Sequence, residues 1–197
     1  MSKFDRRKFI KTTSLSAAFA STPGLYSFKS RSSEQKYMGD FISPKLKNIK
    51  AAFIGVGNRG KGHINLFASL PGTEVVAISD LYEDNINASK EILKKLNKPV
   101  DRINTYWGGE NKWKTMLKEV KPDIVFISTN WNSHGEMAIE TMKNNAHAFV
   151  EVPLALSIKQ LWEIVNTSEK YNKHCMMMEN VNYGREELMF LNIIRNG

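Results

Sequence analysis

Three glycines and one aspartate have the residue types and spacing that most directly suggest chemistry in this sequence. Gly55, Gly57 and Gly60 match the pattern G-x-G-x-x-G and follow the apolar run 51–54. In this pattern the first glycine permits a tight turn, the second lets a pyrophosphate approach the backbone, and the third lets helix and strand pack closely. Asp80 lies 20 residues after Gly60, where a carboxylate bonds a ribose 2′-hydroxyl and repels a 2′-phosphate. The motif predicts dinucleotide binding, with NAD favoured over NADP.

Strands and helices that alternate along the chain must position these residues. Apolar runs predict strands at 51–54, 74–79, 123–128, 146–150 and 174–178. Helical spacing of apolar residues predicts helices at 59–70, 84–96, 111–120, 133–144, 157–171 and 186–195. Strands rich in Val and Ile, separated by helices of this length, indicate an α/β fold with a doubly wound parallel sheet. The sequence therefore predicts a Rossmann-type NAD-binding domain over residues 49–197.

The distribution of charge argues against a nucleic-acid-binding protein. The 197 residues include 28 Lys and Arg and 20 Asp and Glu, which gives a net charge of +8. Residues 1–50 hold 11 basic and 3 acidic side chains, whereas residues 51–197 hold 17 of each. A neutral body does not attract phosphates as an electrostatic funnel, so no nucleic-acid partner is expected. No run of 18 apolar residues occurs, so no transmembrane helix is predicted.

The first fifty residues are interpreted as an export signal followed by a linker. Residues 5–11 read Asp-Arg-Arg-Lys-Phe-Ile-Lys and resemble a twin-arginine export signal. The apolar stretch 15–19 and an Ala-x-Ala cleavage site at 18–20 follow in the expected order. We therefore predict a signal over residues 1–20 and a disordered linker over 21–48; the alternative is a disordered basic tail. The signal implies the twin-arginine export machinery as a partner, and a periplasmic or periplasmic-side membrane-associated location.

Three polar segments follow predicted strands and reduce the number of protein families that the sequence can resemble. They read Ser-Thr-Asn-Trp-Asn-Ser-His at 128–134, Glu-Val-Pro at 151–153 and Glu-Asn-Val-Asn-Tyr-Gly-Arg-Glu-Glu-Leu at 179–188. With the glycine pattern, the chain from about residue 50 onward resembles the glucose–fructose oxidoreductase / inositol dehydrogenase (Gfo/Idh/MocA) superfamily. Members of that family usually carry Glu-Lys-Pro, whereas Val152 stands at the middle position here. Valine cannot transfer a proton, which argues against ordinary polyol dehydrogenation.

The Glu-Val-Pro variant and the segments 174–180, 183–188 and 191–197 resemble one branch, glycoside hydrolase family 109, which includes NAD-dependent α-N-acetylgalactosaminidases. Its members often carry twin-arginine signals. The resemblance implies hydrolysis of a glycoside or glycan ending in N-acetylgalactosamine: the sugar is oxidised at C3, its C1 substituent is eliminated across C1–C2, water adds, and C3 is reduced again. It also implies a second α/β substrate domain. That domain is missing here, so we expect this chain alone to be inactive.

The resemblance also assigns roles to individual positions. Asn58 and Arg59 would lie at the pyrophosphate, and Asp80 at the adenosine ribose. The remaining cofactor-binding positions are Trp131, Asn132, Ser133 and His134 on the nicotinamide side, Glu151 and Val152 at the nicotinamide ribose, and Asn180 at the closure of the pocket. Tyr183 would be catalytic and move the proton at C2; the alternative is a packing aromatic. His134 either contacts the cofactor or caps its helix.

Several questions stay open at the level of sequence. The runner-up function is an exported NAD(P)-dependent sugar oxidoreductase, and a third is a sensor that binds nucleotide without turnover. A homo-oligomer also stays open. Cys175 is the single cysteine, so no intramolecular disulfide and no cysteine-based metal site are expected. His63 is interpreted as a residue that faces solvent or fills a packing gap, and Trp107-Gly108-Gly109 as an ordered loop without clear chemistry.

Overall fold

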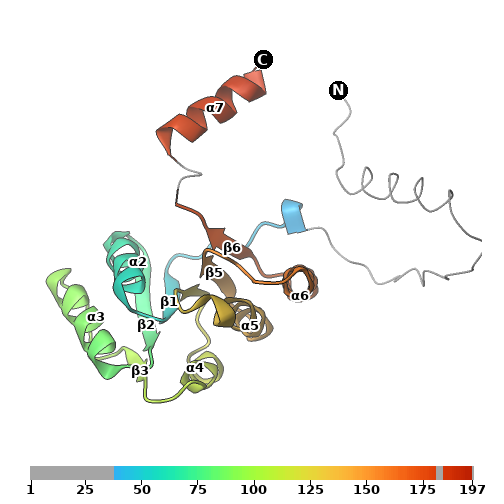
Figure 1. Ribbon diagram of the computed structural model, residues 1–197. Coiled ribbons are helices and arrows are strands. Elements are labelled where there is room, and N and C mark those ends of the chain that lie inside the picture. The colour runs from blue at the N-terminus through green and yellow to red at the C-terminus, as the bar shows by residue number, and fades with distance from the viewer. Residues whose placement is uncertain (1–37, 181–183, 197) are drawn as a thin grey trace, which may run out of the picture. The chain divides into compact units, whose positions relative to one another are not determined.

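The computed structural model describes residues 38–180 and 184–196, and its centre is a six-stranded parallel sheet in the order β3-β2-β1-β4-β5-β6 (Figure 1). The strands are β1 (Ile49–Ile54), β2 (Thr73–Ser79), β3 (Asn104–Tyr106), β4 (Ile124–Ile127), β5 (His147–Glu151) and β6 (Cys175–Met178). The helices are η1 (Met38–Asp40), α2 (Asn58–Ser69), α3 (Glu83–Lys95), α4 (Lys112–Val120), α5 (Trp131–Lys143), α6 (Ile158–Tyr171) and α7 (Arg185–Asn196).

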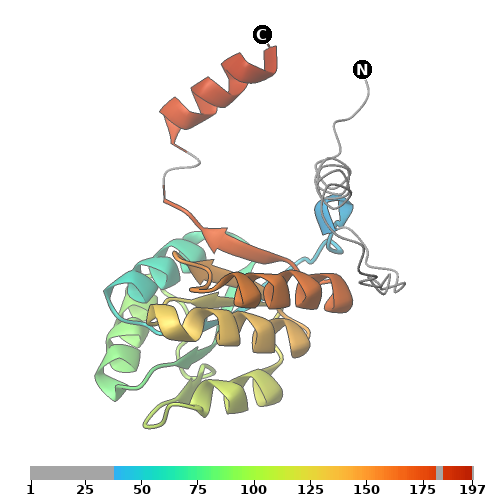
Figure 2. The same cartoon turned by 45° about the vertical axis from the view of Figure 1, so that its right-hand side comes forward.

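Alternate residues of the central strand β1 enter two different cores. Ala51 and Phe53 pack with Ile64 and other residues of α2 and α3, whereas Ala52 and Ile54 pack with α4, α5 and α6. Successive side chains of a strand point to opposite faces, so helices must cover both faces of this sheet. Figure 2 shows α4, α5 and α6 side by side on one face. The predicted doubly wound α/β fold is confirmed.

A row of aromatic rings crosses the α2 face of the sheet. The rings of Phe53 on β1 and Phe126 on β4 stack with centroids 4.8 Å apart, and Phe149 on β5 follows 5.3 Å from Phe126. Phe67 of α2 meets Phe126 edge-on at 5.5 Å. Aromatic pairs in these geometries contribute about 0.5–1.5 kcal/mol beyond their buried area. The row therefore fixes α2, and the residues it carries, against the carboxyl half of the sheet.

A glycine sets how closely α5 and α6 approach each other. A Cβ atom added to Gly135 would lie 2.2 Å from Cδ of Gln160, so no larger residue fits without displacing that side chain. The two helices begin with side-chain caps, in which Asn130 accepts from the Ser133 N–H and Ser157 accepts from the Gln160 N–H. Such caps satisfy backbone donors that a helix start leaves without partners.

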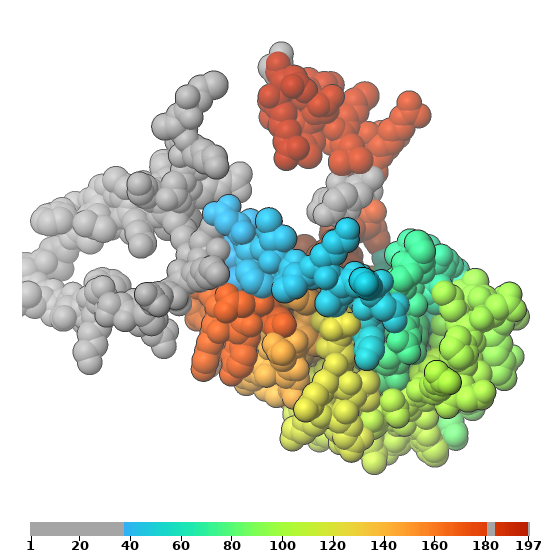
Figure 3. Space-filling model, turned by 180° about the vertical axis from the view of Figure 1, so that it is seen from behind, coloured from blue at the N-terminus to red at the C-terminus, as the bar shows by residue number. Residues whose placement is uncertain are grey.

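Residues 38–48 attach to the amino edge of the sheet, where strands β5 and β6 begin. Figure 3 shows this segment, in blue, on the surface of the domain. The ring of Phe41 lies 5.1 Å from that of His174, and the Ser43 hydroxyl lies 3.2 Å from Nε2 of His147. Nδ1 of His147 accepts the backbone N–H of His174, so Nε2 carries the proton and donates to Ser43. Burial, together with Lys173, lowers the pKa of His147 to about 4.

The structure can be compared with the predicted elements only within the described residues, and it contains elements that the sequence did not predict. The predicted signal over 1–20, and the part of the predicted linker before residue 38, lie outside the described residues. The edge strand β3 was missed, because three residues show no recognisable alternation. Within the described residues, no helix has both the length and the apolar content that a membrane span requires. The short helix η1 (Met38–Asp40) lies within the predicted linker and was not predicted either. The remaining strands and helices begin and end within two residues of their predicted positions.

Candidate functional site

A cavity of about 480 Å³ lies at the carboxyl ends of β1, β2 and β4. This volume falls within the usual range for small-molecule sites, roughly 300–1,000 Å³. In open parallel sheets, ligands bind at this edge where the strand order reverses, which here is between β1 and β4. Five of the predicted cofactor-binding residues line the cavity: Gly55, Gly57, Asp80, Asn132 and Ser133.

The three glycines of the loop between β1 and α2 are each required for a different reason. Gly55 has φ of +78°, and an added Cβ would lie 2.7 Å from the carbonyl oxygen of Ser128. A Cβ on Gly60 would lie 2.1 Å from the carbonyl oxygen of Gly55. Around Gly57 nothing lies within 4 Å of an added Cβ, although this residue lines the cavity. The space in front of Gly57 matches a backbone that a pyrophosphate approaches closely.

The first turn of α2 presents backbone donors that no side chain of the described residues caps. Gly57 is the N-cap, and the first helical hydrogen bond runs from the Lys61 N–H to the Gly57 carbonyl at 3.0 Å. The N–H groups of Asn58, Arg59 and Gly60 therefore have no partner within the helix. Together with the helix dipole, such donors favour an anion. The side chains of Asn58 and Arg59 do not line the cavity.

Asp80 ties the end of β2 to the glycine loop. Its Oδ2 accepts the Val56 N–H at 2.7 Å, and its Oδ1 accepts the Tyr82 N–H at 3.0 Å and the Asn85 amide at 3.1 Å. A carboxylate has about four acceptor positions, so it can accept a ribose hydroxyl in addition. The predicted bond to a ribose stays a prediction, but Asp80 also supports the loop that would hold the phosphates.

Sequence reasoning missed several residues of the cavity wall. The loop between β3 and α4 contributes Gly109, Glu110 and Asn111, and the end of β4 contributes Ser128, whose buried Oγ has no hydrogen-bond partner within the described residues. The hydrogen bond from the Gly108 N–H to the Leu81 carbonyl holds this loop beside β2. Only the doublet Gly108-Gly109 marked it in the sequence. The charged residues of the wall are all acidic, namely Asp80, Glu110 and Glu136, which disfavours a 2′-phosphate.

The segment after β4 separates into cavity-facing and buried residues. Asn130 caps α5 by accepting the Ser133 N–H at 3.2 Å and hydroxyl at 2.9 Å. Trp131 is 60% exposed and does not line the cavity. His134 is fully buried, with Nδ1 2.7 Å from the Pro153 carbonyl oxygen and Nε2 3.1 Å from the Thr129 carbonyl oxygen. Its ring nitrogens therefore connect the loops after β4 and β5.

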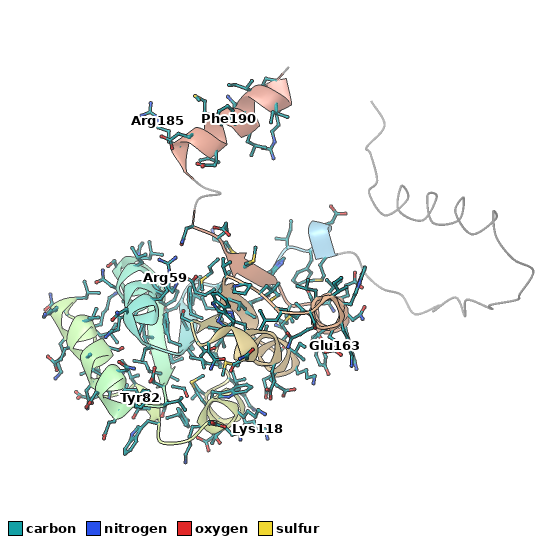
Figure 4. The ribbon with its side chains drawn as sticks, in the orientation of Figure 1. Arg59, Tyr82, Lys118, Glu163, Arg185 and Phe190 are labelled. Carbon is teal, nitrogen blue, oxygen red and sulfur yellow. The ribbon has the colours of Figure 1, made fainter. Side chains whose placement is uncertain are left out.

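Four polar side chains form a second cluster at the same edge of the sheet, around Glu151. Oε1 of Glu151 lies 2.6 Å from Nε of Arg59 and 2.6 Å from Nε2 of His63. Arg59, which Figure 4 labels on α2, also donates to Oδ1 of Asn180. Burial raises the pKa of Glu151, but the hydrogen bonds from Arg59 and His63 outweigh it, so the pKa lies below its usual value. Glu151 is thus held as a carboxylate. His63 was missed because nothing in its spacing distinguishes it from a packing residue.

The last predicted positions have simpler surroundings. Val152 is 38% exposed and follows Glu151 directly. Tyr183, the predicted catalytic residue, lies outside the described residues. Across residues 38–180 and 184–196, no group of three or more His, Cys, Asp or Glu side chains could hold a metal ion. Three features of the described residues fit a dinucleotide: the uncapped first turn of α2, the open space at Gly57 and the unpaired Ser128 hydroxyl.

Comparisons with known proteins agree with this geometry. The chain is 52% identical over 161 residues to a glycosyl hydrolase family 109 protein of Akkermansia muciniphila, which covers 82% of this chain and 33% of that protein. It is 40% identical over 203 residues to the alpha-N-acetylgalactosaminidase of Shewanella oneidensis, across the whole of this chain and 44% of that enzyme. The chain thus spans between a third and a half of the length of these curated relatives.

Solved structures share the fold at low sequence identity. A scyllo-inositol dehydrogenase from Lactobacillus casei, solved with NAD(H) and scyllo-inositol, superposes with a TM-score of 0.65 at 17% identity over 77% of this chain and 42% of that chain. The family model described as "Oxidoreductase family, NAD-binding Rossmann fold" matches residues 49–179. The chain belongs to this family of oxidoreductases with an NAD-binding Rossmann fold.

Proposed function

We propose that this sequence forms the NAD-binding domain of a glycosidase that releases terminal N-acetylgalactosamine. The observation that carries the proposal is the identity of 40–52% to relatives named as glycosyl hydrolase family 109 proteins and as an alpha-N-acetylgalactosaminidase. The cavity at the β1–β4 switch point supports it, because its wall has the glycine loop that a pyrophosphate approaches and acidic side chains that disfavour the additional 2′-phosphate of NADP.

NAD bound at this site would supply reversible oxidation of the sugar at C3. The protein's own contribution starts at the glycine loop, where Gly57 admits the pyrophosphate and the first turn of α2 donates N–H groups to it. Asp80 holds that loop and accepts a hydroxyl of the adenosine ribose, while the residues after β4 and β5 border the nicotinamide end. Because the oxidation is reversed within each turnover, one retained NAD serves many cycles.

Val152 favours a glycosidase over a polyol dehydrogenase. An apolar side chain at this position cannot exchange a proton with a substrate hydroxyl, so this position lacks the proton transfer that a lysine provides. We propose Tyr183 as the residue that removes the proton from C2 once C3 is oxidised. A phenol has a pKa of about 10, so it acts near neutral pH only when a cation is close or the substrate proton has been acidified.

Binding of NAD by the 197-residue chain is the first test. We expect NAD to bind at least tenfold more tightly than NADP in calorimetric titration, because the part of the cavity wall that the structure describes carries three carboxylates and no cationic side chain. A chain that binds neither nucleotide would refute the proposal.

A chimaera tests the activity. Residues 49–179 would replace the matching part of the Akkermansia muciniphila relative, and the product would be assayed on 4-nitrophenyl α-N-acetylgalactosaminide. We expect hydrolysis that depends on retained NAD and incorporates solvent deuterium at C2. The matched control is the same chimaera with Gly57→Ala. Steady NADH formation on a free sugar, without glycoside cleavage, would instead favour the sugar oxidoreductase.

Export by the twin-arginine machinery is part of the proposal and rests on residues 5–11. Replacement of Arg6 and Arg7 by lysines should retain the protein in the cytoplasm of an expressing bacterium. Fractionation followed by immunoblotting measures the outcome, and unchanged export of the variant would refute this assignment.

A further inference from the structure

His63 faces the carboxylate of Glu151 and is shielded from solvent. The side chains are only 15% and 13% exposed, and Nε2 of His63 lies 2.6 Å from Oε1 of Glu151. The imidazole ring also lies against Phe126, with ring centroids 6.0 Å apart and planes inclined by 24°. The contact of one ring face with Phe126 and the hydrogen bond at Nε2 together restrict rotation of the ring. His63 is therefore a fixed donor toward Glu151, the last residue of β5.

The two oxygens of Glu151 have different surroundings. Oε1 receives both hydrogen bonds, one from His63 and one from Arg59. Oε2 has no hydrogen-bond partner within the described residues, although a carboxylate oxygen has two acceptor positions. The arrangement fixes the direction of the carboxylate while it leaves one oxygen available to a ligand.

The two donors differ in how firmly they can hold Glu151. Arg59 is 52% exposed and divides its guanidinium between Glu151 and Asn180. It also lies in the first turn of α2, where arginine is a preferred partner of phosphate. His63 lies one turn further along the helix, is largely buried and has only Glu151 as a hydrogen-bond partner among the described residues. A phosphate at the helix start therefore competes for Arg59 and not for His63.

We propose that His63 is a positioning residue that holds Glu151 so that Oε2 accepts a hydroxyl from the nicotinamide half of a bound dinucleotide. The inference rests on the proposed function, because it needs a dinucleotide in the site. His63 acts through Glu151 and touches neither cofactor nor substrate. It keeps the acceptor in place when the guanidinium of Arg59 turns toward the pyrophosphate.

The test compares two ligands on three variants of the 197-residue chain. NAD reaches the nicotinamide half of the site, whereas ADP ends at the pyrophosphate and the adenosine half. His63→Phe keeps a ring against Phe126 but removes the donor, and His63→Gln keeps an N–H donor of similar reach. Leu66→Ala, on the exposed face of the same helix, is the matched control. Calorimetric titration measures both dissociation constants, and thermal unfolding checks the fold of each variant.

We expect His63→Phe to weaken NAD binding about tenfold, which corresponds to about 1.4 kcal/mol, because the variant loses a hydrogen bond to a charged group. ADP should bind the same variant within about twofold of the parent chain. His63→Gln should recover most of the lost NAD affinity, and Leu66→Ala should match the parent chain for both ligands.

Three results would overturn the inference. Unchanged NAD binding by His63→Phe would show that His63 does not position Glu151. An equal loss of NAD and ADP binding would show a purely structural role. If His63→Phe does not fold, His63→Asn replaces it, because the shorter amide cannot reach Glu151. Equal NAD affinity of the Asn and Gln variants would then show that His63 does not position Glu151. A parent chain that binds neither ligand would refute the proposed function itself, and this inference with it.

Discussion

The second and third glycines of the loop between β1 and α2 should respond in opposite ways to replacement by alanine. Gly57 has φ of −64°, which alanine adopts readily, and an added Cβ meets no atom within 4 Å. Gly60 has no such space, since its Cβ would lie 2.1 Å from the carbonyl oxygen of Gly55. Gly57→Ala should therefore leave the fold nearly as stable as in the parent chain, whereas Gly60→Ala should destabilise it.

The cost of Gly60→Ala follows from that contact. Real Cβ atoms essentially never approach another heavy atom closer than 3.0 Å, so the loop and the helix must separate by about 1 Å. Overpacking of this kind lowers the free energy of unfolding by about 1–3 kcal/mol. Gly60→Ala should lie at the upper end of this range, because the contact involves backbone atoms on both sides. A loss of about 3 kcal/mol would lower the melting temperature by roughly 6–12 °C in a domain of this size.

Gly57→Ala should change binding and leave stability nearly unchanged. Alanine restricts the unfolded chain, which stabilises by about 0.4–1 kcal/mol, but it is a poorer N-cap than glycine, which acts in the opposite direction. The methyl group would stand in the open space beside the cavity, where the pyrophosphate is proposed to pass. We expect NAD affinity to fall more than tenfold, or by more than about 1.4 kcal/mol.

Urea unfolding followed by tryptophan fluorescence, and calorimetric titration with NAD, separate these two effects. Gly62→Ala is the matched control, because Gly62 lies in the same helix with nothing within 4 Å of an added Cβ; it should stabilise by roughly 0.5–1 kcal/mol and bind NAD normally. Parent-like NAD affinity of Gly57→Ala would show that no phosphate passes over that residue. Parent-like stability of Gly60→Ala would show that the close contact with Gly55 does not constrain the loop.

Three further predictions concern residues outside the glycine loop. Asn130→Ala removes the cap that accepts the Ser133 N–H and should lower the free energy of unfolding by about 1 kcal/mol in urea titrations. The pKa of His147 is about 4 in the folded chain and about 6.5 in the unfolded chain. The neutral ring therefore contributes its full stabilisation of the fold above pH 6.5, and this contribution is lost as the pH falls toward 4. Because solvent screens this half-buried ring, the free energy of unfolding should fall by only on the order of 1 kcal/mol. His147→Asn keeps an acceptor for the His174 N–H and should unfold with a flatter dependence between pH 7.5 and 4.5, whereas an unchanged slope would contradict the assignment. Burial raises the pKa of the Cys175 thiol to about 12, so iodoacetamide at pH 8 should react with it at least a hundredfold more slowly than with a free thiol; reaction at the free-thiol rate would contradict this burial.

The sequence predicted what depends on local pattern. The apolar run before Gly55, the glycine spacing and the position of Asp80 were sufficient to place a strand, a turn, a helix and a cavity in the right order. The strand β3 (Asn104–Tyr106) was not predictable, because it gains its hydrogen bonds from the neighbouring β2 and carries no signal of its own. Local sequence patterns therefore predict the central strands and helices, whereas an edge strand such as β3 depends on its neighbour in the sheet.

The candidate site required information that no spacing contains. His63 and Glu151 are 88 positions apart, and only the packing of α2 across Phe126 of β4 brings their side chains together. Glu110 and Ser128 enter the cavity wall because their loops end at the same edge of the sheet, which depends on strand order. His134 lies at the start of α5, but Asn130 and not His134 caps that helix, and the carbonyl groups on both sides of the His134 ring follow from tertiary structure alone.

The attachment of residues 38–48 near His147 has a practical consequence. The strands measure about 3.3 Å per residue, so the amino edge that receives this segment lies roughly 15 Å from the carboxyl edge with the cavity. The chain enters the domain on the side opposite the opening. A bead or sensor surface linked ahead of residue 38 would therefore leave nucleotides a free approach, and immobilised protein should report binding without occlusion of its own site.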